Sequence, residues 1–174
     1  MPPAPQNPSL SGLQSIGSGS LHKARIGPML DGTPMFGDLE WAEIEAFVDY
    51  VKVYRAQAGT VIFREGDKGG SLAVVLEGRV DVFKIGSDGT PKNLSSIGPG
   101  RSFGEMAIVD GEPRSATAMA AVPTMLLVLT RPDFERLVDE QPKLAAKFTL
   151  KLARLLSQRL RQVSGALVEH LGQR

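Results

Sequence analysis

Residues 103–117 read Phe-Gly-Glu-Met-Ala-Ile-Val-Asp-Gly-Glu-Pro-Arg-Ser-Ala-Thr. A glycine and a carboxylate, Gly104 and Glu105, open a short apolar segment, and a Pro-Arg-Ser-Ala-Thr run closes it. An ionised carboxylate only accepts hydrogen bonds, so Glu105 suits a sugar hydroxyl and would repel a phosphate. The guanidinium of Arg114 is a planar, permanently charged fork that suits phosphate oxygens. The stretch therefore has the composition of a loop folded around one small anion that also carries a sugar.

Short β-type runs lie on both sides of this stretch. They are separated by glycine-rich turn signals such as Glu65-Gly66-Asp67 and Gly98-Pro99-Gly100. About eight short strands spaced in this way favour a jelly roll or small barrel over alternating βαβ units. The clearest runs are Val61–Phe63, Ser71–Leu76, Val80–Ile85, Leu94–Ile97, Ala116–Ala121 and Met125–Leu129.

Helical spacing of apolar residues appears before and after the strands. Residues 36–53 predict a first helix, with Asp38 as a candidate N-cap. Residues 133–141 predict a second helix, and Pro142 separates it from a longer one. The longer helix carries a narrow apolar stripe at spacings of three and four, made of Leu152, Leu156, Leu160, Val163, Leu167 and Leu171.

Residues 1–34 have a different composition from the rest of the chain. They hold six of the twelve prolines and five glycines, with apolar residues scattered without period. Such a segment buries too little surface to offset its ordering entropy, so we expect a flexible tail. It would serve either as a tether or as a docking peptide, with residues 21–26 as the most adhesive part.

Five short motifs follow one another in a fixed order. They occupy residues 58–67, 76–80, 98–100, 103–117 and 152–154. Together they resemble the cyclic nucleotide-binding domain family over residues 36–161. The resemblance implies a mainly β α+β fold: an eight-stranded jelly-roll β-barrel with an N-terminal helix, an embedded phosphate-binding cassette and C-terminal helices. The implied organisation is a tail (1–34), a nucleotide-binding jelly roll with flanking helices (35–141) and a lid or interaction helix (142–174).

The resemblance also implies a ligand site. In the family the cassette Glu holds the ribose 2′-hydroxyl, and the Arg, the next Ser and backbone N–H groups hold the cyclic phosphate. The long C-terminal helix closes over the purine. The register expected here gives Val163 and Ser164, with Arg159 and Arg161 nearby. The implied ligand-binding residues are Gly104, Glu105, Met106, Ala107, Arg114, Ser115, Ala116, Thr117 and Ser164.

Two features leave the ligand open. No aromatic residue follows Phe148, so an aromatic lid is absent, and one purine hydrogen-bond donor of the family's transcription-factor pattern is missing as well. The implied ligand is therefore cAMP, with cGMP as an alternative. Arg114 and Glu105 could also pair with each other in a site that has lost its ligand.

Composition excludes several other functions. The chain has no cysteine and two histidines without partners at metal-ligand spacing, so we predict no metal site and no enzyme. No apolar run approaches the ~18 residues of a spanning helix, and no signal peptide is present, so we expect a cytoplasmic protein without a membrane partner. From Pro142 onward seven basic residues face Glu169 alone. That basic helix could meet nucleic acid, an acidic partner or water.

The sequence therefore predicts a stand-alone receptor domain for a cyclic mononucleotide, most readily cAMP. It would signal by ligand-dependent movement of its C-terminal helices to a protein effector, and its long helix could form a homodimer. We expect no specific nucleic-acid binding, because family transcription factors continue into a helix-turn-helix of roughly 70 residues and this chain stops at Arg174. The alternatives are an interaction module of the same fold that has lost nucleotide binding, and a DNA-binding regulator that lacks the usual reading head.

Overall fold

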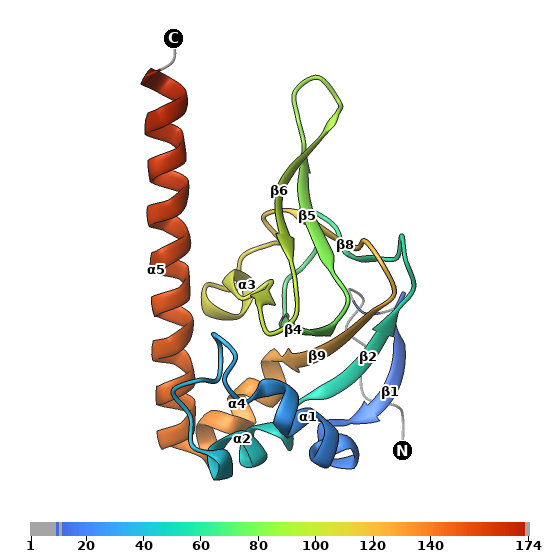
Figure 1. Cartoon of the computed structure of the whole chain (residues 1–174), viewed down its shortest axis with the longest axis vertical. Coiled ribbons are helices and arrows are strands. Elements are labelled where there is room, and N and C mark those ends of the chain that lie inside the picture. Colours follow the sequence, from blue (N-terminus) through green and yellow to red (C-terminus); the bar gives the residue numbers. More distant parts are fainter. Residues whose placement is uncertain (1–9, 11, 173–174) are drawn as a thin grey trace.

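Two antiparallel sheets form the centre of the computed structural model, which describes residue 10 and residues 12–172 (Figure 1). The larger sheet has the order β1-β2-β9-β4-β7, with strands Gln14–Ser18, Lys52–Ala56, Thr124–Thr130, Ser71–Glu77 and Ser102–Phe103. The smaller sheet has the order β3-β8-β5-β6, with strands Val61–Phe63, Thr117–Ala120, Val80–Ile85 and Pro91–Ile97. This confirms the mainly β jelly-roll fold. The sequence missed β1, β2 and β7.

The central strands β4 and β9 are apolar at almost every position because they are covered on both faces. They pair antiparallel, with Val74 opposite Leu127. Side chains of a strand alternate between its two faces. Accordingly Val74 and Leu127 pack in a core beneath the helices, whereas Val75 and Leu126 pack in a second core between the sheets. Two apolar cores therefore share one pair of strands.

Most of the helices lie at one end of the roll, whereas a short one lies beside the strands and the last one runs along the molecule (Figure 1). Helix α2 spans Trp41–Val48 and begins at a capping box, in which the Glu40 and Glu43 side chains each accept a hydrogen bond from the other residue's backbone N–H. The predicted start at Asp38 was wrong, because Asp38 instead forms an ion pair with Lys151. The remaining helices are η2 (Gly19–His22), α1 (Lys23–Leu30), α3 (Met106–Val109), α4 (Arg131–Glu140) and α5 (Pro142–Gly172).

The expectation of a flexible tail over residues 1–34 is wrong for residues 12–34. These residues form β1, η2 and α1, and the side chains of Ile26 and Leu30 are buried in the helix-covered core. Strand β1 pairs with β2, so the edge of an existing sheet supplies its backbone hydrogen bonds. A few apolar residues are enough to hold this segment in place, because other segments of the chain build most of the core that they enter. Residues 1–9 and 11 lie outside the described residues.

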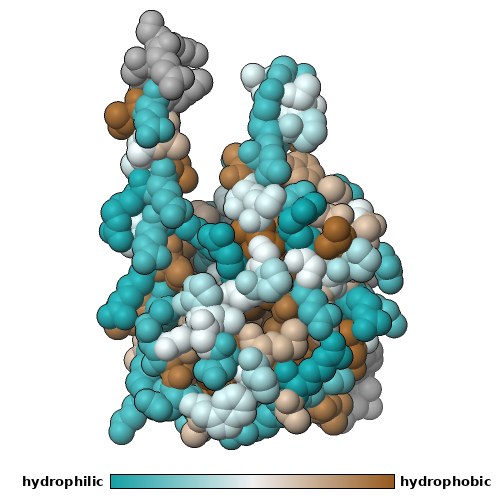
Figure 2. Space-filling model, viewed as in Figure 1, coloured by the Kyte–Doolittle hydropathy of each residue, from teal (hydrophilic) through white to brown (hydrophobic). Residues whose placement is uncertain are grey.

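Helix α5 changes its surroundings along its length. Its first three turns pack in the core through Leu144, Phe148 and Leu152. The C-terminal part of the helix, in which the side chains from Leu160 to Glu169 are exposed, projects past the body of the roll, beside the β5–β6 hairpin but apart from it (Figures 1 and 2). Pro142 separates α4 from α5, as predicted. Within the described part of the chain, no helix is both long and apolar enough to cross a membrane.

Candidate functional site

The predicted cassette connects β7 to β8 through α3 and one loop. It turns sharply at Gly104, whose φ of 74° lies in the left-handed region that favours glycine. A Cβ atom there would also lie 2.7 Å from Nη1 of Arg114 and 3.2 Å from the Phe63 ring. Glycine at this position therefore allows both the turn and the close approach of the arginine.

Arg114 lies inside the roll rather than at its surface, with only 4% of its area exposed. Its guanidinium stands 4.0 Å from the centroid of the Phe63 ring. Nη1 donates to the carbonyl oxygens of Ser71 (2.7 Å) and Gly104 (2.8 Å), and Nη2 donates to the Ser71 hydroxyl (2.9 Å). Nε is buried and has no hydrogen-bond partner among the described residues. The side chain is therefore held in place, and its Nε–H remains free to donate.

Burial also sets the charge state of Arg114. Loss of solvation lowers the pKa of Arg114 to about 10, an effect that the nearby Asp67 and Glu105 carboxylates partly offset. The guanidinium is still protonated at neutral pH. The site thus holds a permanent positive charge in a setting where solvent screens it less than at the surface.

Glu105 is buried as well, with 3% exposure. Its Oε1 accepts a hydrogen bond from Nη1 of Arg159 on α5. Its Oε2 is buried without a partner in the part of the chain that the structure describes. The partner of Glu105 is thus Arg159 rather than Arg114, which argues against a relic site closed by its own Arg–Glu pair.

The other cassette residues fall into three settings. Ser115 is exposed, and its hydroxyl lies 3.7 Å from the sulfur of the half-exposed Met106. Ala107 and Ala116 are buried. Thr117 is buried at the start of β8, where its hydroxyl accepts a hydrogen bond from the backbone N–H of Glu65 (3.0 Å). The structure therefore brings the cassette residues together. Thr117 also stabilises the turn that begins at Glu65.

The lid residue expected from the sequence is not the one that reaches the cassette. Ser164 is exposed on α5, five residues beyond Arg159. At 3.6 residues per turn it points about 140° away from Arg159 around the helix axis. The spacing of residues along the helix could have indicated Arg159. It lies seven residues after the buried Leu152 and therefore on the same, inward face of the helix.

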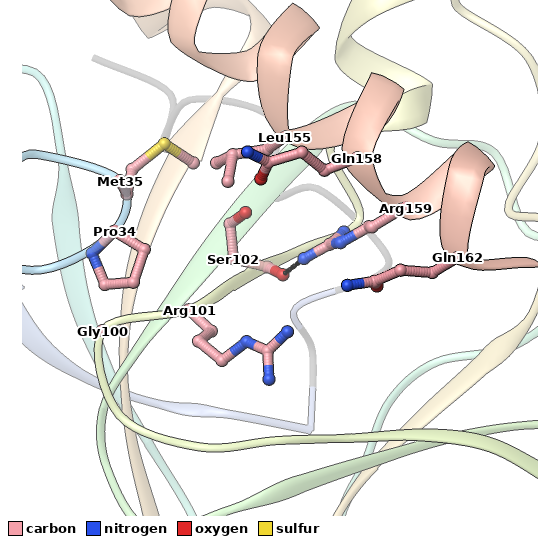
Figure 3. A pocket seen from close by; sticks show the side chains of 9 residues that line it. All are labelled: Pro34, Met35, Gly100, Arg101, Ser102, Leu155, Gln158, Arg159 and Gln162. Carbon is pink, nitrogen blue, oxygen red and sulfur yellow. Dashed lines mark hydrogen bonds between the residues drawn. The ribbon is translucent and has the colours of Figure 1, made fainter.

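A cavity of about 280 Å³ lies between α5 and the β6–β7 connection (Figure 3). Arg159 extends across it from α5 and donates through Nη2 to the carbonyl oxygen of Ser102 (2.6 Å). The Ser102 hydroxyl is buried and lacks a partner in the described chain. The polar side chains around the cavity belong to Arg101, Ser102, Gln158, Arg159 and Gln162. This cavity adjoins the cassette through Arg159.

One contact ties the cassette to the other C-terminal helix. Arg131, the first residue of α4, donates through Nη2 to the carbonyl oxygens of Ala107 (2.6 Å) and Ile108 (3.2 Å) at the end of α3. A cation at a helix C-terminus is favourable because the unpaired carbonyls carry partial negative charge. Both C-terminal helices therefore touch the cassette through an arginine, and sequence patterns alone had not indicated the Arg131 contact.

Comparison with known proteins identifies the family. The family described as "Cyclic nucleotide-binding domain" matches residues 53–141, which is half of the chain. The chain belongs to the cyclic nucleotide-binding domain family. It is 36% identical over 133 residues to the cyclic AMP receptor protein of Thermus thermophilus, covering 76% of this chain but only 60% of that relative's length.

Solved structures agree with this assignment. A cyclic nucleotide-binding domain from Methylobacillus flagellatus superposes with a TM-score of 0.77 at 31% identity, covering 87% of this chain and 85% of that one. The regulatory domain of Toxoplasma gondii PKA, crystallised with cAMP, gives a TM-score of 0.59 at 28% identity and covers 66% of this chain and 44% of that one. Among the described residues of this family member, no cluster of three or more histidines, cysteines or carboxylates could hold a metal ion.

Proposed function

We propose that this cyclic nucleotide-binding domain is a receptor for a cyclic mononucleotide, cAMP before cGMP, bound at residues 104–117. One observation carries the proposal: Glu105 Oε2 and Arg114 Nε–H are both buried in the cassette and both lack a partner among the described residues. Buried polar groups are normally hydrogen-bonded. A ribose hydroxyl would satisfy the first group and a phosphate oxygen the second, so these residues fit the ligand of the family.

The remaining cassette residues have supporting roles. Ser115 follows Arg114 in the chain and is exposed, and its hydroxyl would add a second donor for the phosphate. Gly104, Met106, Ala107, Ala116 and Thr117 would shape the loop around the ligand. The names of two related proteins support cAMP: one is called a cyclic AMP receptor protein, and the other was crystallised with cAMP.

The output that we propose is a contact with a protein partner. A ligand shifts a conformational equilibrium only by its difference in affinity for the two states. Arg131 and Arg159 join the cassette to α4 and α5, so both helices would respond to occupancy. The stripe of Leu160, Val163 and Leu167 is exposed on α5 and suits another apolar helix, from a second copy or a different protein. A regulatory role without catalysis and a cytoplasmic location stay predictions.

Calorimetric titration of the full chain with cAMP, cGMP and cCMP tests the ligand. We expect cAMP to bind, and the Glu105→Gln variant to bind it about ten- to hundred-fold more weakly, because a hydrogen bond to a charged acceptor is lost. Glu112→Gln is the matched control, since Glu112 is an exposed carboxylate in the same loop. Absence of binding to all three nucleotides, or equal affinity in the Glu105 variant, would contradict the proposal.

A further inference from the structure

The cavity of about 280 Å³ beside α5 lies outside the cassette, because none of residues 103–117, all of which the structure describes, lines it. We infer that this cavity is a second ligand site, which binds a small organic oxyanion at Arg101 and Ser102. The ligand is a carboxylate or a phosphate monoester that carries an apolar body. This site goes beyond the proposed function and does not depend on it.

The charged side chains around the cavity are both cationic. They are Arg101, from the β6–β7 connection, and Arg159, from α5, and no described residue that lines the cavity is acidic. The charge of Arg159 is balanced by Glu105. The side chain of Arg101, by contrast, is exposed and has no ion-pair or hydrogen-bond partner among the described residues. The cavity therefore presents one uncompensated positive charge, which attracts anions.

The polar groups reach the cavity from its two sides (Figure 3). Arg159 and Gln162 extend from α5 toward the β6–β7 connection, and the guanidinium of Arg101 extends from that connection into the same space. A guanidinium presents a planar fork of donors that matches the oxygens of a carboxylate or a phosphate. The amide of Gln162 can add a further N–H donor. An oxyanion in this space would therefore meet donors from both elements.

Ser102 supplies an independent sign of a ligand. The residue is only 2% exposed, and its hydroxyl is buried without a hydrogen-bond partner in the part of the chain that the structure describes. Figure 3 shows its side chain turned toward α5, whereas its carbonyl oxygen accepts the hydrogen bond from Arg159. Buried hydroxyl groups are normally hydrogen-bonded. A ligand that reached the inner wall of the cavity would satisfy this group.

The rest of the wall is apolar and is held by the core. Met35 is buried in the helix-covered core, and Leu155 packs against the same core. Gly100 has a φ of 75°, and a Cβ atom there would lie 2.8 Å from Cγ2 of Thr33. Glycine thus lets the α1–α2 loop, which carries Met35, pack directly against the β6–β7 connection. Small-molecule sites combine such an apolar wall with a few polar groups, so we assign an apolar body to the ligand.

Two aromatic oxyanions, benzoate and phenyl phosphate, serve as probes that distinguish a carboxylate from a phosphate ligand. Benzamide is the neutral compound that matches benzoate in shape. Each is titrated into the full chain while backbone amide shifts are followed by NMR, for wild type, Arg101→Gln, Ser102→Ala and Arg161→Gln. Arg161 is an exposed cation of α5 that bonds to Ser157 and does not line the cavity, so its variant is the matched control.

We expect at least one oxyanion to shift the amides of residues 100–102 and 158–162, and benzamide to bind at least tenfold more weakly than benzoate. Arg101→Gln should weaken the oxyanion at least tenfold, because a charge-assisted hydrogen bond is lost. Ser102→Ala should weaken it about three- to tenfold, and Arg161→Gln should leave it unchanged. The same shifts should appear with saturating cAMP, because the cassette is a separate site.

Three outcomes overturn the inference. Absence of shifts at these amides with both oxyanions would mean that the cavity holds no such ligand. Equal binding of benzoate and benzamide, or equal losses in Arg101→Gln and Arg161→Gln, would remove the specific role of Arg101. Displacement of the probe by cAMP would make the cavity a part of the nucleotide site. Failure of the chain to bind cAMP would contradict the proposed function alone, since the probe titrations judge this site without it.

Discussion

The first half of α5 (residues 142–157) and the second half (158–172) share the spacing of their apolar residues but have opposite surroundings. Phe148 in the first half is 1% exposed and packs against Phe36, Phe47 and Phe134. Leu160 in the second half is 67% exposed. Both halves carry apolar residues at spacings of three and four, so the pattern alone does not distinguish them. Apolar periodicity shows that a helix has a face to bury, but not what covers that face.

The junction between the halves coincides with the candidate site. Arg159 makes its contacts with Glu105 and Ser102 where the apolar packing of α5 ends. Position on the helix, more than composition, thus separates a buried, stabilising segment from an exposed one.

The largest expected effect is on the first half. Phe148→Ala should lower the free energy of unfolding by about 3–5 kcal/mol, because it removes a buried aromatic and leaves a cavity. Leu160→Ala is the matched control on the second half and should change stability by less than about 0.5 kcal/mol. Urea unfolding of both variants measures the difference. Similar losses would mean that the second half is packed as firmly as the first.

The second half should matter for association instead. Removing residues 162–174 should leave thermal stability close to that of the full chain and abolish self-association, if α5 pairs with a second copy. Sedimentation of both forms, with and without cAMP, measures this. Leu171 belongs to the predicted stripe, but its side chain lies outside the described residues.

A point substitution sharpens the same test. Leu167→Asp places a charge on the exposed apolar stripe, and Ala166→Asp places the same charge beside it, also at an exposed position. We expect only the first to disrupt association. If full-length protein and both variants sediment as the same monomer, the stripe does not pair two copies of this chain.

The smallest expected effect is the pH dependence that comes from the ion pairs made by the first half of α5. Hydrogen bonds from Lys151 and Lys147 lower the pKa of Asp38 and of Glu43 from their ordinary values of 3.8 and 4.5. Depressed carboxyl pKa values contribute stability that is present above those ordinary values and is lost as pH falls through the folded values. Thermal melts between about pH 5 and pH 3 should therefore show a smaller decline in a Lys147→Ala/Lys151→Ala variant than in wild type. Identical slopes would mean that these exposed pairs do not contribute.

Much of the roll could be predicted because its strands carry their own signals. Val80–Ile85 was predicted with the bounds that the structure shows, and Gly-rich turns marked most neighbouring strands. Two of the strands that were missed, β1 and β7, depend on their partners. Strand β7 has two residues and exists by pairing with β4, and β1 is held at the edge of β2. Pairing between distant segments leaves no periodic signal within either one.

The sequence by itself determined the family, the cassette and the identity of most candidate ligand residues, because residues 103–117 are contiguous and their chemistry is local. Only the tertiary structure decided that the Glu105 carboxylate pairs with Arg159, 54 positions away, and that residues 12–34 fold onto the roll. It also decided which half of α5 is buried. These features depend on which surfaces meet in space. The sequence around a residue does not indicate which distant side chain it will contact in the folded protein.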